Sequence, residues 1–333
     1  MPQARKEQIF LEETSYYHCI SRCVRRAFLY GEDALTGQNY DHRKQWVVDR
    51  LAELSGVFAI DVCAYAVMSN HYHVVLRVDE AQAGTLTREA VVERWGRLFK
   101  LPVPIERYMK GEAESEAERL HAEQVIEEWR ERLTNISWFM RGLNEPLARW
   151  ANEEDQVTGR FWEGRFKSQA LLDEVAVLSC MSYVDLNPVR AGLAETPEAS
   201  SYTSIQARIQ SELANGVATP HLPVPLMPLV REAEDGHCQA IGVTLPEYLE
   251  LVDWAGRSIR EDKRGAISQG IPPILGRLGI DAGEYLQRMS GRSRAMEGLA
   301  LGAVDRVKAF AGRFGRGFVR GQRQGGALYQ AKQ

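Results

Sequence analysis

The chain has 333 residues, of which 44% are hydrophobic and 26% charged, and 41 Lys and Arg residues against 45 Asp and Glu residues give a net charge of −4. These values are ordinary for a soluble globular protein, and the length predicts two folded units or one unit with a large appendage. No run of about 18 apolar residues is present, so no membrane-spanning helix is expected. Because the global charge is slightly acidic, a nucleic-acid-binding function would need locally concentrated basic residues.

The N-terminal segment and the cysteines predict a cytoplasmic protein. The N-terminal segment lacks the long apolar core of a signal peptide. Five cysteines form no C-x-x-C pair and leave one without a partner. This usage favours reduced thiols over a disulfide framework or a cysteine zinc site.

The first 80 residues alternate between strand and helix patterns. Residues 15–21 are aromatic and apolar, which predicts a strand, and a basic cluster of Arg22, Arg25 and Arg26 follows it. Residues 44–56 have the apolar spacing of an amphipathic helix and end at a glycine. Residues 57–78 are rich in β-branched and aromatic side chains, and a break at 68–70 divides them into two paired strands.

A helical region follows, over about residues 85–155. Within it, residues 112–131 contain eight Glu residues, a pattern typical of a solvated helix face, and residues 136–150 carry an apolar stripe that indicates core. Farther along, Asp173 is a plausible N-cap of a helix that ends near Leu186, because Pro188 disfavours helical backbone in the residue before it.

The C-terminal third is less regular. Residues 208–240 contain several prolines and are predicted to be a linker, and residues 241–305 to be a helical accessory region. Residues 306–333 hold seven basic residues and no acidic residue, with many glycines. This predicts a basic tail that adds salt-sensitive DNA affinity, or a disordered end with no partner.

Two histidines are spaced to act together. His71 and His73 lie two residues apart in a predicted strand, so both imidazoles point to one face and Tyr72 to the other. Two imidazoles on one face can bind one metal ion. The alternative is a pair of surface or core histidines.

A tyrosine and an amide form a second pair. Tyr183 and Asn187 are four residues apart on a predicted helix and share a face with the small residues Ala176, Ser179 and Cys180. A small-residue face can approach another surface closely and leave the phenol accessible. The alternative is a core tyrosine whose hydroxyl satisfies a nearby polar group.

Taken together and in order, these blocks resemble the single-tyrosine HUH transposases, specifically the REP-associated tyrosine transposases (RAYT). The matching blocks are YHCISR at 17–22, VMSNHYHVVL at 67–76, GRFWEGRF at 159–166 and YVDLNPVRAGL at 183–193. The resemblance covers roughly residues 10–207, and the transposase domain would extend over residues 1–207. It also implies that the helical block at 85–155 is an insertion relative to the smallest family members. It implies an α+β fold, in which a ferredoxin-like antiparallel sheet carries the histidines on a central strand. Helices would cover one face, and the Tyr183 helix would pack at the sheet edge.

The resemblance also implies a reaction. His71, His73 and Asn187 would bind Mg²⁺ or Mn²⁺, with Asn187 at a position where some relatives carry Gln. Tyr183 would be the nucleophile that forms a 5′-phosphotyrosine with DNA. A phenol is mostly protonated near neutral pH, so nearby metal charge would have to activate it.

The implied substrate is single-stranded or hairpin DNA such as repetitive extragenic palindromes, bound by a monomer or a homodimer. Candidate DNA contacts combine cations with an aromatic ring; they are Arg22, Arg25, Arg26, Arg160, Trp162, Arg165, Lys167 and Arg190. The alternatives are that the aromatic residues of the 159–166 block belong to the core and that Arg190 is a helix-end cation.

Two other functions fit the same residues. The first is a non-catalytic regulator, derived from a transposase, that binds palindromes. The second is a metal-dependent hydrolase unrelated to DNA, which would use water as nucleophile and form no covalent adduct.

Overall fold

The computed structural model describes residues 8–24, 31, 37–213, 224–229, 240–259 and 300–312. Five strands form one sheet in the order β2-β3-β1-β4-β5. The strands are β1 (Tyr16–Arg22), β2 (Ile60–Val67), β3 (His71–Val78), β4 (Lys167–Leu171) and β5 (Ala300–Leu301). The pairs β2–β3, β3–β1 and β1–β4 are antiparallel, whereas β5 runs parallel to β4. The sheet is therefore mixed and not purely antiparallel as predicted, because a C-terminal strand adds to its edge.

Two long helices cover one face of the sheet. They are α1 (His42–Val57) and α6 (Ile136–Glu154), and they pack against each other. The order β1-α1-β2-β3-α6-β4 is the β-α-β-β-α-β arrangement of ferredoxin-like sheets. The core between the helices and the sheet includes Leu51 of α1, Phe139 and Leu143 of α6, and Tyr72 and Val74 of β3.

The opposite face is covered as well, which differs from the predicted single helical layer. The helices α7 (Glu174–Asp185) and α10 (Leu245–Ile259) form this second layer together with the short α8 (Asn187–Arg190) and with α9 (Ser204–Leu213). Helix α7 packs over β2, β3 and β4 rather than at the sheet edge, and α10 packs on α7. Because α7 lies between the sheet and α10, nearly all its side chains are buried.

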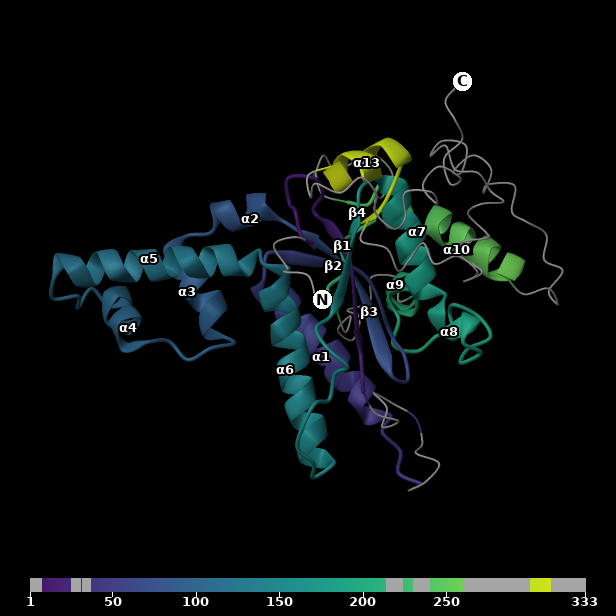
Figure 1. Cartoon of the computed structure of the whole chain (residues 1–333), viewed down its shortest axis with the longest axis horizontal. Coiled ribbons are helices and arrows are strands. Elements are labelled where there is room, and N and C mark those ends of the chain that lie inside the picture. Colours follow the sequence, from purple (N-terminus) through teal and green to yellow (C-terminus); the bar gives the residue numbers. More distant parts are fainter. Residues whose placement is uncertain are drawn as a thin grey trace.

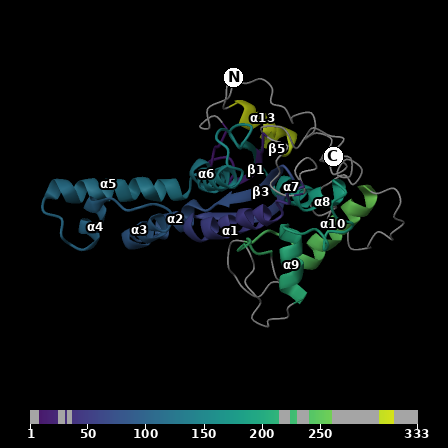
Figure 2. The same ribbon diagram turned by 90° about the horizontal axis from the view of Figure 1, so that it is seen from below.

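The helical region after β3 forms an arm. It contains α2 (Glu80–Thr85), α3 (Arg88–Gly96), α4 (Val103–Met109) and α5 (Glu116–Leu133). Figures 1 and 2 both show α3, α4 and α5 projecting away from the sheet. The region predicted as an insertion at 85–155 thus contains most of this arm and also α6, whose apolar stripe packs in the layer on the sheet.

The C-terminal residues that the structure describes pack on the main fold. Helix α13 (Val304–Gly312) buries Val307 and Phe310 in the core of the α1 and α6 face. Residues 306–312, predicted as the start of the tail, thus form part of a helix, and 208–213 of the predicted linker lie in α9. The remaining linker, accessory and tail predictions fall mostly on 214–223, 230–239, 260–299 and 313–333, outside the described residues. Among the helices described, none combines the length and apolar character that crossing a membrane requires.

Candidate functional site

His71 and His73 share one face of β3, which has β2 on one side and β1 on the other. Their ring centroids are 4.9 Å apart. His73 is 3% exposed, whereas His71 is only half-buried at the start of the strand. Tyr72 points to the opposite face and joins the core there. The two imidazoles therefore face the layer that contains α7.

Each of the two imidazoles uses its Nδ1 atom in a hydrogen bond. The His71 Nδ1 atom lies 2.7 Å from the Asn70 Oδ1 atom, and the His73 Nδ1 atom lies 2.9 Å from the Nε2 atom of His18 on β1. The His18 and His73 rings are stacked with their centroids 5.1 Å apart. In the part of the chain that the structure describes, the buried His73 Nε2 atom has no hydrogen-bond partner. Such an imidazole nitrogen is a good ligand atom for a divalent cation.

Burial keeps these imidazoles neutral near pH 7. It lowers the pKa of His18 to about 4, and a side-chain hydrogen bond with Gln169 on β4 offsets part of this effect. Burial also lowers the pKa of His71 to about 4, and the charge of Arg22 adds to it. The pKa of His73 is well below its ordinary value, first because of burial and then because of the neighbouring histidines. Metal binding requires the neutral form of histidine.

Tyr183 meets the histidines across the interface between α7 and the sheet. Its ring centroid lies 5.8 Å from that of His73 and 6.2 Å from that of His18, in edge-to-face arrangements. On the other side, the Arg190 guanidinium lies 4.6 Å from the centre of the Tyr183 ring. The half-buried phenol thus lies between neutral imidazoles and a cation. The small residues of α7 named above are fully buried and allow the helix to lie close to the sheet.

Asn187 follows Tyr183 by one helical turn. Its Nδ2 atom donates a 3.1 Å hydrogen bond to the Tyr183 carbonyl oxygen, which keeps the amide at the end of α7. The Asn187 amide thus bonds the backbone of α7 and not an imidazole. Within the described ranges, no group of three or more His, Cys, Asp or Glu side chains is placed to hold a metal ion. The candidate ligand set is therefore two imidazoles, one with an unpartnered nitrogen, and one amide.

A buried carboxylate holds the end of α7 in place. The Asp185 Oδ1 atom accepts hydrogen bonds from the Ser204 hydroxyl at 2.5 Å and from the Ile205 backbone N–H at 3.0 Å. Its Oδ2 atom accepts one from the Tyr248 hydroxyl of α10 at 2.6 Å. Burial raises the pKa of Asp185 to about 6, although these hydrogen bonds lower it in part. Asp185 thus links the tyrosine helix to α9 and α10.

The predicted basic contacts fall on several parts of the fold. Arg22 is exposed and pairs with His71 in the strand register, so it flanks the histidines. Arg160, Arg165 and Lys167 are exposed and precede or begin β4. Arg190 contacts the Tyr183 ring as described above. Arg25 and Arg26 lie outside the described residues.

Trp162 has a packing role in the structure. It is half-buried, its indole N–H donates a 2.9 Å hydrogen bond to the Asn144 carbonyl of α6, and its ring packs edge-to-face on Tyr72. The Asn144 side chain in turn donates to the Ser21 hydroxyl at 2.9 Å and accepts from the Tyr72 hydroxyl at 2.6 Å. Phe161 is also buried. These rings join the 159–166 block to the sheet, whereas the basic residues of the block are exposed.

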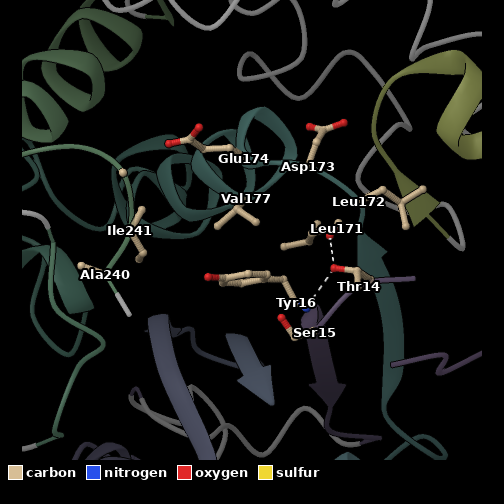
Figure 3. A pocket seen from close by; sticks show the side chains of 11 residues that line it. Thr14, Ser15, Tyr16, Leu171, Leu172, Asp173, Glu174, Val177, Ala240 and Ile241 are labelled. Carbon is tan, nitrogen blue, oxygen red and sulfur yellow. Dashed lines mark hydrogen bonds between the residues drawn. The ribbon is translucent and has the colours of Figure 1, made fainter. Parts of the chain in front are cut away.

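A cavity of about 430 Å³ lies at the other end of α7. Figure 3 shows the Tyr16 phenol reaching into it between Val177 and Ser15, with Glu174 at its rim. None of the predicted site residues lines this cavity. The cavity is therefore separate from the cluster of His18, His71, His73 and Tyr183.

Three residues of the site were not predicted from the sequence. His18 sits in the matching YHCISR block, Asn70 precedes the histidine pair, and Asp185 is a carboxylate in an otherwise apolar helix. The last pattern is a usable signal, because a buried charge requires partners. The contacts of His18 and Asn70 depend on strand pairing and local geometry, which composition does not reveal.

The chain matches no protein-family model and no curated protein sequence. Among solved structures, it is similar to a REP-associated tyrosine transposase bound to a REP hairpin, with 12% sequence identity and a TM-score of 0.36. The alignment covers 73% of this chain and 97% of that chain. A similarity this low carries no inference about fold or function, which rest on the geometry above.

Proposed function

We propose that this protein is a metal-dependent, single-tyrosine transposase or single-strand DNA endonuclease that cleaves and rejoins hairpin DNA. The observation that carries the proposal is the convergence of Tyr183 with His73, whose ring centroids lie 5.8 Å apart although 110 positions separate the residues. A phenol beside neutral imidazoles and a guanidinium is suited to nucleophilic attack on a phosphodiester.

In the proposed reaction, Tyr183 is the nucleophile. Its oxygen forms a bond to phosphorus, the bond to the 3′-oxygen breaks, the phenol loses its proton and the leaving oxygen gains one. The products are 5′-phosphotyrosyl DNA and a free 3′-hydroxyl. Because one phosphodiester replaces another, the reverse attack rejoins the strand without ATP.

The surrounding residues support this chemistry through charge and ligand atoms. Arg190 provides positive charge next to the phenol, which favours negative charge on its oxygen. His71, His73 and Asn187 are the proposed ligands of Mg²⁺ or Mn²⁺. When bound, the ion would polarise the scissile phosphate.

The proposed DNA contacts are the exposed basic residues around this site. Arg22 flanks His71, and the exposed cations of the 159–167 segment lie beside the start of β4, next to β1. Contacts of this kind bind phosphates without reading the base sequence. They are expected to make hairpin binding sensitive to salt.

The test is a covalent-adduct assay with Mn²⁺ and a panel of 3′-labelled hairpin oligonucleotides that carry single-stranded flanks. Wild-type protein is expected to retain label after denaturation, and Tyr183→Phe to retain none. Tyr16→Phe is the matched control, because Tyr16 lies on the same sheet face but lines the separate cavity. His73→Ala should lose cleavage and keep hairpin binding.

Two results contradict the proposal. If Tyr183→Phe cleaves as well as wild-type protein, tyrosine is not the nucleophile. Cleavage without any adduct would instead identify a hydrolase that uses water.

The second candidate function is a non-catalytic, palindrome-binding regulator. It is favoured by the exposed basic residues around the site, which would bind DNA phosphates whether or not the strand is cleaved. This candidate predicts that wild-type protein binds the hairpin with Mn²⁺ present and cleaves none of it.

A further inference from the structure

The buried residue His18 has no role in the proposed reaction. It is 1% exposed, lies on β1 next to the histidine strand and stacks on His73. Its Nε2 atom is 2.9 Å from the His73 Nδ1 atom. One of these two nitrogens must therefore carry the proton of the hydrogen bond. Because a neutral imidazole carries one proton, the position of this proton decides whether His73 Nε2 is an N–H group or has a free lone pair.

The two arrangements differ in what they leave at His73 Nε2. If His18 donates, neutral His73 carries its proton on Nε2, and this buried N–H has no acceptor among the described residues. If His73 donates, its Nε2 atom has a free lone pair. A buried N–H without an acceptor is the rarer and costlier defect. The second arrangement places the His18 proton on Nδ1, an atom that, like His73 Nε2, has no partner at standard hydrogen-bond geometry among the described residues. The Gln169 side chain faces His18 from β4, and its interaction with His18 raises the pKa of that imidazole, as an amide oxygen that accepts from the His18 N–H would. Within the described part of the chain, the first arrangement offers the His73 Nε2 proton no such neighbour.

The neighbouring histidine shows the same arrangement. The His71 Nδ1 atom faces the Asn70 Oδ1 atom at 2.7 Å, and a carbonyl oxygen only accepts. His71 therefore carries its proton on Nδ1 and leaves its Nε2 lone pair free. Both histidines then present the same type of ligand atom.

We propose that His18 is a positioning residue that accepts the His73 Nδ1 proton and thereby directs the His73 Nε2 lone pair into the Tyr183 site, as Asn70 does for His71. The role rests on the proposed function in so far as the lone pairs serve a divalent cation. Outer partners of metal-binding histidines fix the tautomer in this way.

The test measures tautomers directly in the metal-free protein. Long-range ¹H–¹⁵N correlation spectra of ¹⁵N-histidine-labelled wild-type protein should show His73 protonated on Nδ1. His18→Gln, whose amide oxygen can still accept, should retain this tautomer. His18→Leu should lose it and weaken Mn²⁺ binding, measured by calorimetry, by about 10- to 100-fold. Val74→Ala, which shortens a buried side chain on the opposite face of β3, is the control and should leave the tautomer and the affinity unchanged.

Two outcomes overturn the proposal. One is wild-type His73 protonated on Nε2, a result that does not depend on any variant folding. The other is a folded His18→Leu protein that keeps both the tautomer and the Mn²⁺ affinity. If wild-type protein binds no Mn²⁺ while the tautomer follows His18, the proposed function fails and the positioning role stands.

Discussion

At the scale of single residues, the site is built from ionisable side chains that burial holds in their neutral forms. His18 and His71 have pKa values near 4. The unfolded chain has ordinary histidines, with pKa values of about 6.5. Between these limits the unfolded state binds more protons than the folded state. The free energy of unfolding therefore has its full value, as far as His18 and His71 are concerned, above pH 6.5, and it decreases as the pH falls toward 4.

We expect His18→Gln to reduce this acid sensitivity. His18 alone accounts for about 3 kcal/mol of stability lost between pH 6.5 and 4. Asp185 acts in the opposite direction, because its raised pKa makes its contribution largest at low pH, and that contribution is lost as the pH rises through about 6. The Asp185 effect is common to both proteins and cancels in their difference. Urea unfolding at a series of pH values measures that difference.

The exposed His121→Gln on α5 is the control for this experiment and should follow the wild-type curve. Parallel curves for His18→Gln and wild-type protein would show that His18 does not titrate as a buried group. The histidine cluster would then be more open to water than its burial indicates.

At the scale of elements, the orientation of α7 depends on contacts at its two ends. Asp173 caps its N-terminus by accepting from the Ala176 backbone N–H at 2.8 Å. Asp185 holds its C-terminus through Ser204 and Tyr248. Helix α10, which lies in the region predicted to be accessory, therefore helps to hold the tyrosine helix in place.

Tyr248→Phe is expected to destabilise the fold by about 1–3 kcal/mol, because it removes a hydrogen bond to a buried carboxylate. Adduct formation should fall more than hairpin binding, since the helix that carries Tyr183 loses an anchor while the exposed basic residues remain. Tyr108→Phe in the arm is the control, because its hydroxyl bonds the arm residues Arg88 and Glu123 at a more exposed site. An unchanged unfolding midpoint for Tyr248→Phe would show that the Asp185 contact contributes nothing measurable.

At the scale of the whole molecule, helix α13 (Val304–Gly312) is part of the core. Phe310 is fully buried and packs edge-to-face on Phe10, with ring centroids 6.2 Å apart. The Arg306 guanidinium donates to the Leu172 carbonyl oxygen at 2.7 Å. Two truncations can therefore separate folding from any role of the basic residues beyond α13.

Ending the chain at residue 305 should lower stability by several kcal/mol more than ending it at 312, because the loss of Phe310 alone is expected to cost about 3–5 kcal/mol. The shorter deletion removes five basic residues and no acidic residue. If these contact DNA, the salt dependence of hairpin binding will become less steep. An unchanged slope in fluorescence anisotropy titrations would show that residues 313–333 do not bind DNA.

Much of the local structure could be predicted from the sequence. Alternation and helical periodicity indicated β1, the paired strands β2 and β3, the helix α1 and the apolar stripe of α6, and the Asp173 cap marked the start of α7. The i, i+2 spacing also placed His71 and His73 on one face. These features depend on chain geometry over a few residues, which any window of sequence contains.

Only the tertiary structure decided how these pieces meet. Strand register brought His18 to His73, packing of α7 over the sheet brought Tyr183 to both, and packing on the opposite face placed Trp162 against α6. It also placed helices on both faces and joined α13 to the core. Contacts between residues tens to hundreds of positions apart depend on the burial of shared apolar surface, and no local pattern specifies which distant face a side chain will meet.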